Sequence, residues 1–264
     1  MANVRSSNRG AITLIEITRP ERRNAVDSAT ASELHDAFTR FDADDSQSVA
    51  VLSGDGAHFC AGADLKALAE GDQRDLGADA IGPMGPTRMR LSKPVIAAIE
   101  GYAVAGGLEL AIWCDLRVAA EGAVFGVFCR RFGVPLIDLG TVRLPRLIGH
   151  GRAMDMILTG RAVDAHEALS FGLVNRVVPN GEAKAAAVAL AETLSAFPQR
   201  CLRHDRWSAI EQWGCDESKA MRRELELGVQ TIASGETHAG ALAFDNGLGR
   251  HAASLLKTPD DTED

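Results

Sequence analysis

The chain has 264 residues, of which 46% are hydrophobic and 24% charged, as in an ordinary globular protein with a sizeable core and one or two domains. Its net charge of −8 argues against a general nucleic-acid surface, but it allows a local basic patch for a phosphorylated ligand. The sequence begins without an apolar signal core, and no apolar run approaches the length of a membrane span. We therefore expect a soluble, cytoplasmic protein that binds neither nucleic acid nor membrane.

The cysteines and the common cofactor motifs exclude several kinds of site. Five cysteines form no CxxC pair, which is typical of reduced thiols rather than of disulfides or a zinc site. GDGAHF lacks the third glycine of the dinucleotide fingerprint, and neither GxxxxGK[ST], GxSxG nor HExxH occurs. We therefore expect no nicotinamide, ATP or metal cofactor, and no serine hydrolase.

The first part of the chain predicts short strands separated by turns and a helix. Residues 11–17 alternate as in an opening strand, Asp27 or Ser28 is suited to cap a helix, and residues 49–52 form a short strand. The apolar stripe of that helix consists of Leu34, Ala37, Phe38 and Phe41. Residues 69–85 are rich in Gly, Asp and Pro, so they form either a mobile segment over a site or a poorly ordered loop.

The second part changes in character near residue 200. The predicted elements are an irregular stretch over 125–150, a helix over 152–158, a helix capped by Asp164 and ending at Gly172, a strand over 173–178, and helices from Glu182 that break at Pro198 and Gly214. Mixed strands and helices thus give way to helices alone. We expect a core of repeated β and α units over residues 1–200, and a helical region over residues 201–264.

The stretch over residues 93–126 carries the first candidate for chemistry. KPVIAAIEGYAVAGG predicts a buried strand followed by glycines, and LELAIW continues as a helix. Gly106 thus lies at a helix start, where backbone N–H groups lack partners inside the helix. Glu109 lies about one turn further on, near the same point. Two interpretations are open: an amide and a carboxylate that act on a carbonyl group, or a tight turn with a solvated glutamate.

A second turn has the same design. Residues 60–63, like residues 105–106, place small residues between a strand and a helix start. If the two strands are neighbours, the amides of Ala63 and Gly106 converge on one oxygen. Such a pair forms an oxyanion hole, in which each donor contributes ~3–4 kcal/mol to transition-state stabilisation. This chemistry is suited to thioesters, which form an enolate or a tetrahedral oxyanion.

Together these motifs resemble the crotonase superfamily, the enoyl-CoA hydratase/isomerase family. The resemblance rests on FCAGADLKAL and PVIAAIEGYAVAGGLELAIWCDLRVAAEGAVFG, and it extends to RPERRNAVD, GTVRLPRLIG and LTGRAVDAHEALSFGLVNRVV in a consistent order. It covers roughly residues 10–250. It implies an α/β fold with a crotonase-like spiral of repeated β-β-α units and a helical C-terminal trimerisation region. It also implies an acyl-CoA substrate and a homotrimer or a dimer of trimers.

The resemblance also implies roles for individual residues. Ala63 and Gly106 match the positions that supply the oxyanion-hole amides, and Glu109 matches a catalytic glutamate. The positions that match the family's substrate and CoA contacts are Arg22, Arg23, Ala25, Ala61, Asp64, Leu65, Lys66 and Gly107. Arginines beside CoA would be suited to its phosphates. Coenzyme A enters as part of the substrate, and no separate cofactor or metal is implied.

One position departs from the hydratase pattern. Cys129 stands where hydratases of the family have a second glutamate, and a thiol is a poor substitute for a carboxylate in proton transfer. Asp138 either supplies the missing carboxylate, or caps a turn, or pairs with Arg143 or Arg146. Cys129 itself is expected to form pocket wall rather than a nucleophile. The first prediction is an enoyl-CoA hydratase, and the alternatives are a double-bond isomerase or a weakened acyl-CoA-binding relative.

Overall fold

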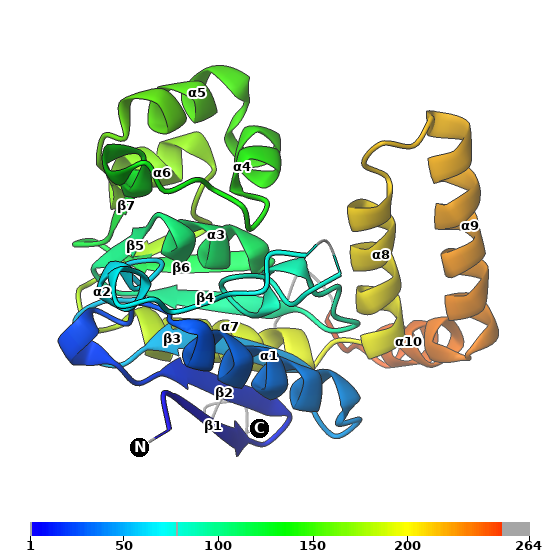
Figure 1. Cartoon of the computed structure of the whole chain (residues 1–264). Coiled ribbons are helices and arrows are strands. Elements are labelled where there is room, and N and C mark those ends of the chain that lie inside the picture. The colour runs from blue at the N-terminus through cyan, green and yellow to red at the C-terminus, as the bar shows by residue number, and fades with distance from the viewer. Residues whose placement is uncertain (1, 78, 250–264) are drawn as a thin grey trace.

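The structure is a computed structural model that describes residues 2–77 and 79–249 (Figure 1). The strands are β1 (Val4–Arg9), β2 (Ile12–Ile17), β3 (Val49–Gly54), β4 (Val95–Ile99), β5 (Tyr102–Val104), β6 (Leu116–Ala120), β7 (Val124–Gly126), β8 (Val163–Asp164) and β9 (Arg176–Val178). The helices are α1 (Ser28–Ala43), α2 (Leu65–Ala69), α3 (Gly106–Trp113), α4 (Gly140–Ile148), α5 (His150–Thr159), α6 (Ala165–Phe171), α7 (Ala183–Ser195), α8 (Gln199–Glu211), α9 (Glu217–Ala233) and α10 (Glu236–Asp245). Three short 3-10 turns are η1 (Pro20–Arg22), η2 (Pro86–Arg88) and η3 (Phe128–Phe132).

The described strands form two sheets, and successive β-β-α units contribute strands to both of them. The larger sheet has the order β1-β2-β3-β4-β6-β9, and the smaller has the order β5-β7-β8. Strands β4 and β6 each lie in the larger sheet, while the strands that follow them, β5 and β7, pair in the smaller one. Helix α3 follows β5, and η3 and α4 follow β7. The prediction of an α/β fold built from repeated β-β-α units is therefore confirmed.

The middle of the larger sheet is buried on both faces, which explains the continuous apolar run of β4. Ile96 and Ala98 face a core that includes α7, whereas Ala97 and Ile99 face the main core with α1 and α3. A strand covered on both sides shows no alternation of apolar and polar residues. Helix α7 lies across the lower face of the sheet in Figure 1, so the first helix after residue 182 belongs to the core.

Several local predictions are confirmed by the caps of the helices. The side chain of Asp27 accepts a hydrogen bond from Thr30 N at 2.8 Å, at the start of α1. Asp164 accepts from Glu167 N at 2.8 Å at the start of α6, and Gly172 ends that helix in the left-handed conformation. A side chain that accepts from the first turn satisfies an amide that has no helical partner. These cap residues therefore define the helix boundaries as the sequence predicted.

Other elements differ from the sequence-based expectation. Strand β1 precedes the predicted opening strand. Its polar sequence does not indicate a strand, because β1 lies at the exposed edge of the sheet and, among the described strands, pairs only with β2. Helix α4 occupies much of the stretch expected to be irregular, even though it contains Pro145. Strand β9 has only three residues, shorter than predicted. Tertiary packing outweighs local propensity at these places.

Side-chain hydrogen bonds fasten the segment over residues 69–85, which has no helix or strand beyond the end of α2 among its described residues. The guanidinium of Arg74 donates to the carbonyl oxygen of Pro83 at 2.9 Å and to that of Val26. The side chain of Asp72 accepts from the backbone N–H of Ser28 at 3.1 Å. Met84, at the end of the segment, is buried. These contacts therefore hold the segment in place beside α1 and α2.

Helices α8 and α9 pack against each other and stand beside the core (Figure 1). Residues 250–264 of the predicted helical region lie outside the described part of the chain. Among residues 2–77 and 79–249, no helix combines the length and the apolarity that crossing a bilayer requires.

Candidate active site

The two small-residue turns lie against each other, as the sequence predicted for neighbouring strands. Cys60 pairs with Ala103 of β5 in an isolated parallel bridge. Gly62, with φ of +95°, approaches the start of α3 so closely that a Cβ on it would lie 2.9 Å from Gly106 N. A side chain at this position is therefore excluded by both conformation and space. The close approach of the two backbones brings the candidate amides to one place.

The amides of Ala63 and Gly106 have no acceptor among the described residues of the protein. Val26 N donates to Gly62 O at 2.8 Å and Asp64 N donates to Val26 O at 2.9 Å, so the N–H of Ala63 between them points away from Val26. Gly106 is the first residue of α3, where an N–H group has no partner within the helix. In the described part of the chain, neither N–H has a protein acceptor. Ala63 and Gly106 both line one cavity of about 430 Å³.

Glu109 enters the same cavity from α3, and a turn further along the chain holds it in place. Its Oε1 accepts hydrogen bonds from Asp138 N at 2.9 Å and from Gly140 N at 2.8 Å. A Cβ on Gly140 would lie 2.7 Å from that same oxygen, so only glycine allows this approach. Leu139, between the two donors, has φ of 68°, an uncommon conformation for a residue with a side chain. The turn thus fits around the Glu109 carboxylate.

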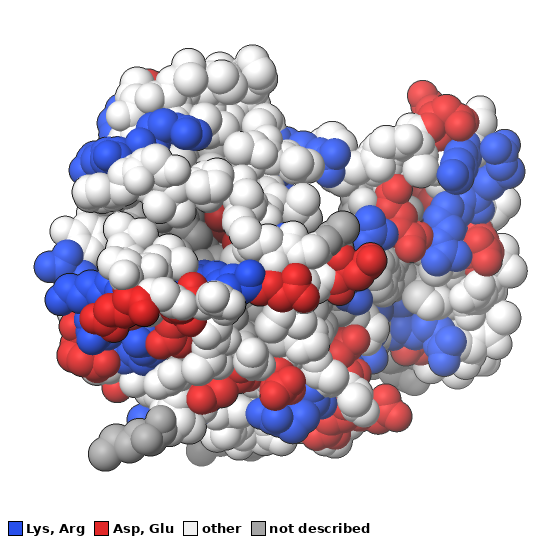
Figure 2. All heavy atoms as spheres, in the orientation of Figure 1, with Lys and Arg blue, Asp and Glu red and all other residues white. Residues whose placement is uncertain are grey.

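Asp138 brings a second carboxylate to the cavity. Its Oδ1 accepts from Met84 N at 3.1 Å and from the hydroxyl of Thr87. Arg143 donates to the carbonyl oxygen of Asp138 at 3.2 Å, and no ion pair joins the Asp138 carboxylate to Arg143 or Arg146 in the described chain. Each of the two carboxylates therefore has one oxygen held by donors, while within the described residues the other accepts no hydrogen bond. Figure 2 shows acidic atoms at the bottom of a hollow on this face.

The electrostatic environment raises the pKa of both carboxylates. Burial, and then the charge of Asp138, raise the pKa of Glu109 to about 7. Burial also raises the pKa of Asp138, although hydrogen bonds from Thr87 and Met84 oppose this. Burial and the charge of Glu109 raise the pKa of the Cys129 thiol. Around neutral pH Glu109 therefore readily holds a proton, and it lies beside a second buried carboxyl group, Asp138, and the neutral thiol of Cys129.

The predicted contacts to substrate and CoA fall into two groups. Ala61 and Leu65 line the cavity, together with Cys129. The residues that do not line it are Arg22, Arg23, Ala25, Asp64, Lys66 and Gly107. Asp64 instead caps α2 and pairs with Arg19 at 3.0 Å, while Gly107 packs where a Cβ would lie 2.1 Å from Cys60 O.

The two predicted arginines lie at the surface. Arg23 lies over the ring of Tyr102, with its guanidinium carbon 5.7 Å from the ring centre, and Arg22 is exposed. Contacts of both residues with coenzyme A remain a prediction.

Sequence reasoning missed residues that hold the site together. Met84 and Thr87 donate to a carboxylate more than fifty positions away, and Arg143 donates to Thr87 O at 2.8 Å. Nothing in the local pattern around Met84 or Thr87 indicates these contacts. The Gly140-Thr141 pair was a usable signal, since glycine after a candidate aspartate indicates a close approach.

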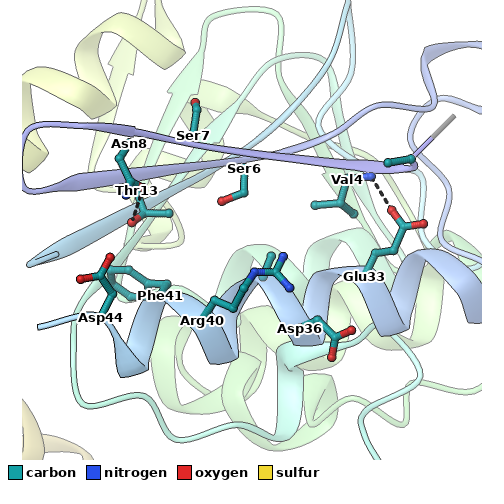
Figure 3. A pocket seen from close by; sticks show the side chains of 12 residues that line it. Val4, Ser6, Ser7, Asn8, Thr13, Glu33, Asp36, Arg40, Phe41 and Asp44 are labelled. Atoms are coloured by element: carbon teal, nitrogen blue, oxygen red, sulfur yellow. Dashed lines mark hydrogen bonds between the residues drawn. The ribbon is translucent and has the colours of Figure 1, made fainter. Parts of the chain in front are cut away.

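A larger hollow of about 630 Å³ lies elsewhere, between α1 and the β1–β2 hairpin (Figure 3). Its side chains are mostly polar and open to solvent, and Glu33 accepts a hydrogen bond from Val4 N at 2.9 Å. It lacks the buried pair of carboxylates and the free amides of the smaller cavity. Across the described residues, no group of three or more His, Cys, Asp or Glu side chains is arranged to hold a metal ion. The smaller cavity is therefore the candidate active site.

Comparisons with known proteins identify the family of the chain. The sequence profile described as "Enoyl-CoA hydratase/isomerase" matches residues 7–248. The chain is 35% identical to enoyl-CoA hydratase EchA19 of Mycobacterium tuberculosis, over 89% of this chain and 91% of the relative. It is 40% identical to carnitinyl-CoA dehydratase of Proteus mirabilis, over 90% of this chain and 93% of the relative.

Solved structures show the same fold. The crystal structure of enoyl-CoA hydratase EchA1 from Mycobacterium marinum superposes with a TM-score of 0.88 at 36% identity, covering 93% of this chain and 96% of that one. The chain is an acyl-CoA enzyme that belongs to the enoyl-CoA hydratase/isomerase family of the crotonase superfamily.

Proposed function

We propose that the protein is an enoyl-CoA hydratase that adds water across the double bond next to a thioester carbonyl. The observation that carries this proposal is the pair Glu109 and Asp138, each with one oxygen held and one without a hydrogen bond, in the cavity that also holds two free amides. Hydration requires one group that activates water and one that delivers a proton to carbon. Asp138 takes the place of the second family glutamate, whose position Cys129 occupies.

The proposed reaction proceeds through an enolate. The thioester oxygen accepts hydrogen bonds from the amides of Ala63 and Gly106, which stabilise the negative charge that develops on it. Ionised Asp138 takes a proton from water as the water oxygen bonds to C3. Protonated Glu109 then gives its proton to C2, and the proton on Asp138 passes to Glu109. The product is a 3-hydroxyacyl thioester, and both carboxylates return to their starting states.

A second candidate is double-bond isomerisation, which one specific feature favours. A carboxylate whose pKa is about 7 is suited both to remove a proton and to return it at neutral pH. Glu109 alone would then take a proton from C2 of a 3-enoyl thioester and return it to C4. In this reaction the water-activating role of Asp138 is not needed. The two candidates therefore differ in their dependence on Asp138.

The names of the relatives support hydration or its reverse. Enoyl-CoA hydratase, carnitinyl-CoA dehydratase and mevalonyl-coenzyme A hydratase all denote addition or removal of water at a CoA thioester. Coenzyme A would enter this site only as part of the substrate.

The first experiment is turnover of crotonyl-CoA, followed by loss of absorbance of the conjugated thioester. We expect activity in the natural protein and a loss of at least about a hundredfold in both Glu109→Gln and Asp138→Asn. Cys129→Ser is the matched control, since it lines the same cavity and we expect activity within about threefold of the natural protein. Loss in Glu109→Gln alone would contradict the water-activating role of Asp138. No turnover of crotonyl-CoA by the natural protein would favour an isomerase, to be tested on a 3-enoyl-CoA. Binding without turnover of either substrate would indicate an acyl-CoA-binding relative.

We also propose that the protein is a homotrimer or a dimer of trimers. Helix α9 exposes large apolar residues at helical spacing: Met221, Leu225, Val229 and Ile232. An exposed apolar stripe of this kind is typical of a surface that a protein partner covers. Light scattering during size-exclusion chromatography would test this, and a monomer of 28.0 kDa would contradict it.

A further inference from the structure

Large apolar side chains gather around the mouth of the candidate active site although water can reach them. The exposed fractions are 41% for Leu65, 36% for Leu68, 60% for Leu76, 68% for Phe132 and 41% for Ile137, and all five line the same cavity. Single exposed apolar residues are ordinary, whereas a contiguous group marks a binding surface. Glu109 and Asp138 line the same cavity as these five apolar residues, so a ligand that binds the two carboxylates can also cover the apolar group.

The cavity has two hydrocarbon walls. Leu65 and Leu68 of α2, together with Leu76, form one wall, while Phe128 and Phe132 of η3 belong to the other. Val134, Pro135 and Ile137 extend the second wall toward Asp138. The volume of about 430 Å³ lies in the range of roughly 300–1,000 Å³ that encloses drug-sized ligands. A four-carbon acyl group would leave much of this surface in contact with water.

The charged side chains of these walls are already engaged by the protein, and Nε of Arg74, which makes no hydrogen bond within the described residues, is buried from solvent. Asp72 lies 3.5 Å from Nε of Arg74 and accepts hydrogen bonds from Ser28. Both terminal nitrogens of Arg74 donate to backbone carbonyls, those of Pro83 and Val26. Among the described lining residues, the remaining ionisable groups are the two carboxylates and the Cys129 thiol at the reacting end. A charged group at the far end of the acyl chain would therefore lose its hydration without gaining a partner.

We propose that this site selects bulky hydrocarbon acyl groups, of about ten carbons or with a ring, over short or charge-bearing ones. The proposal rests on the thioester chemistry proposed above. Contacts with the non-reacting part of a substrate raise kcat/KM because they are kept in the transition state. Full burial of one methylene group favours binding by about fourfold, so several additional methylenes give a large effect even when each is partly buried.

The test compares three 2-enoyl thioesters on the full-length protein: crotonyl-CoA, trans-2-decenoyl-CoA, and the ten-carbon thioester with a carboxylate at its far end. We expect kcat/KM for decenoyl-CoA to exceed that for crotonyl-CoA by at least about tenfold. The terminal carboxylate should reduce it again by at least about tenfold. Equal or lower kcat/KM for decenoyl-CoA than for crotonyl-CoA would overturn the size selection. Equal turnover of the two ten-carbon substrates would overturn the selection against charge.

Two variants connect the preference to the walls. Leu76→Ala and Phe132→Ala should each lower kcat/KM for decenoyl-CoA about five- to tenfold, and should lower kcat/KM for crotonyl-CoA by a smaller factor. Leu158→Ala is the control, because Leu158 of α5 is 67% exposed, like Phe132, but does not line the cavity. Equal losses on both substrates, or no loss with decenoyl-CoA, would contradict the assignment of these walls.

Binding measurements distinguish a failure of this inference from a failure of the proposed reaction. Calorimetry with saturated butyryl-CoA and decanoyl-CoA measures the acyl preference without turnover. If no enoyl thioester is converted, the proposed function fails, yet at least about tenfold tighter binding of decanoyl-CoA would still support the inference. Equal affinities for the two saturated thioesters would overturn it.

Discussion

Replacing Gly140 by alanine offers a sharp test of how Glu109 is held. The added Cβ would lie 2.7 Å from Oε1, 2.8 Å from Cγ and 3.0 Å from Cδ of Glu109, so the carboxyl group must move. Gly140 is the first residue of α4, and its φ is not in the left-handed region, so alanine suits the backbone there. The perturbation therefore falls on the candidate catalytic group rather than on the helix.

The expected loss of activity follows from this displacement. Moving the carboxylate weakens its hydrogen bond with Gly140 N, now 2.8 Å long, and a hydrogen bond to a charged group contributes about 1.5–3 kcal/mol. A misplacement of about 1 Å at a reacting group lowers the rate by about a hundredfold. We therefore expect kcat to fall by about 30- to 300-fold. The free energy of unfolding should change by less than about 1 kcal/mol, because alanine favours helix over glycine and offsets part of the crowding.

The assay combines thioester turnover with urea unfolding. Gly151→Ala is the control, since Gly151 lies inside α5 and a Cβ there would meet no atom within 4 Å. It should be slightly more stable than the natural protein and equally active. If Gly140→Ala keeps activity within threefold, the reasoning that this turn positions a catalytic Glu109 is wrong.

Three further predictions concern charge. The folded-state pKa of Glu109 is about 7 against 4.5 for an ordinary glutamate, so the folded protein loses stability as the pH rises from about 4.5 to about 7. In urea unfolding at pH 8, Glu109→Gln should therefore be about 2–3 kcal/mol more stable than the natural protein, and at pH 5 the difference in stability should be much smaller. The same difference in stability at both pH values would contradict this. Arg143 lowers the pKa of Glu109, so Arg143→Met should move the pH optimum of kcat/KM upward, while Arg143→Lys should not. Asp64→Asn breaks the buried pair with Arg19, so chemical unfolding should show that the free energy of unfolding falls by about 2–4 kcal/mol. Calorimetry should show an affinity for free coenzyme A within about twofold of that of the natural protein. A larger loss of affinity would instead support the contact predicted from sequence.

The sequence alone predicted the parts of the site that lie close together along the chain. Gly106 and Glu109 are one helical turn apart, so the start of α3 by itself places the amide and the carboxylate close together. The pairing of the turns at Ala63 and Gly106 needed only the assumption of neighbouring strands. Asp138 was identified as a candidate by its place before Gly140, and it does line the cavity.

The parts that sequence did not predict depend on contacts over long separations. Whether Asp138 faces the cavity is decided by Met84 and Thr87, which hold its Oδ1 from 54 and 51 positions away. Their neighbourhood is a glycine- and proline-rich segment whose composition gives no path through space. Asp64 shows the opposite case: its neighbours resemble a binding motif, yet its carboxylate is occupied by the cap of α2 and by Arg19.

Uncommon backbone conformations occur at two turns that orient backbone N–H groups in the candidate active site, one before Gly106 and one at Leu139. Ala105, with φ of 54°, precedes the free N–H of Gly106, and Leu139, with φ of 68°, lies between the two N–H groups that hold Glu109. Non-glycine residues in such regions cost of order 1–3 kcal/mol each, and they persist where surrounding packing determines the conformation. Here β5 and β7 fix Ala105 through the bond from its N–H to Gly126 O, and the buried Glu109 fixes the turn at Leu139. The amides are therefore oriented before any substrate arrives, which is the condition under which fixed donors lower a reaction barrier most.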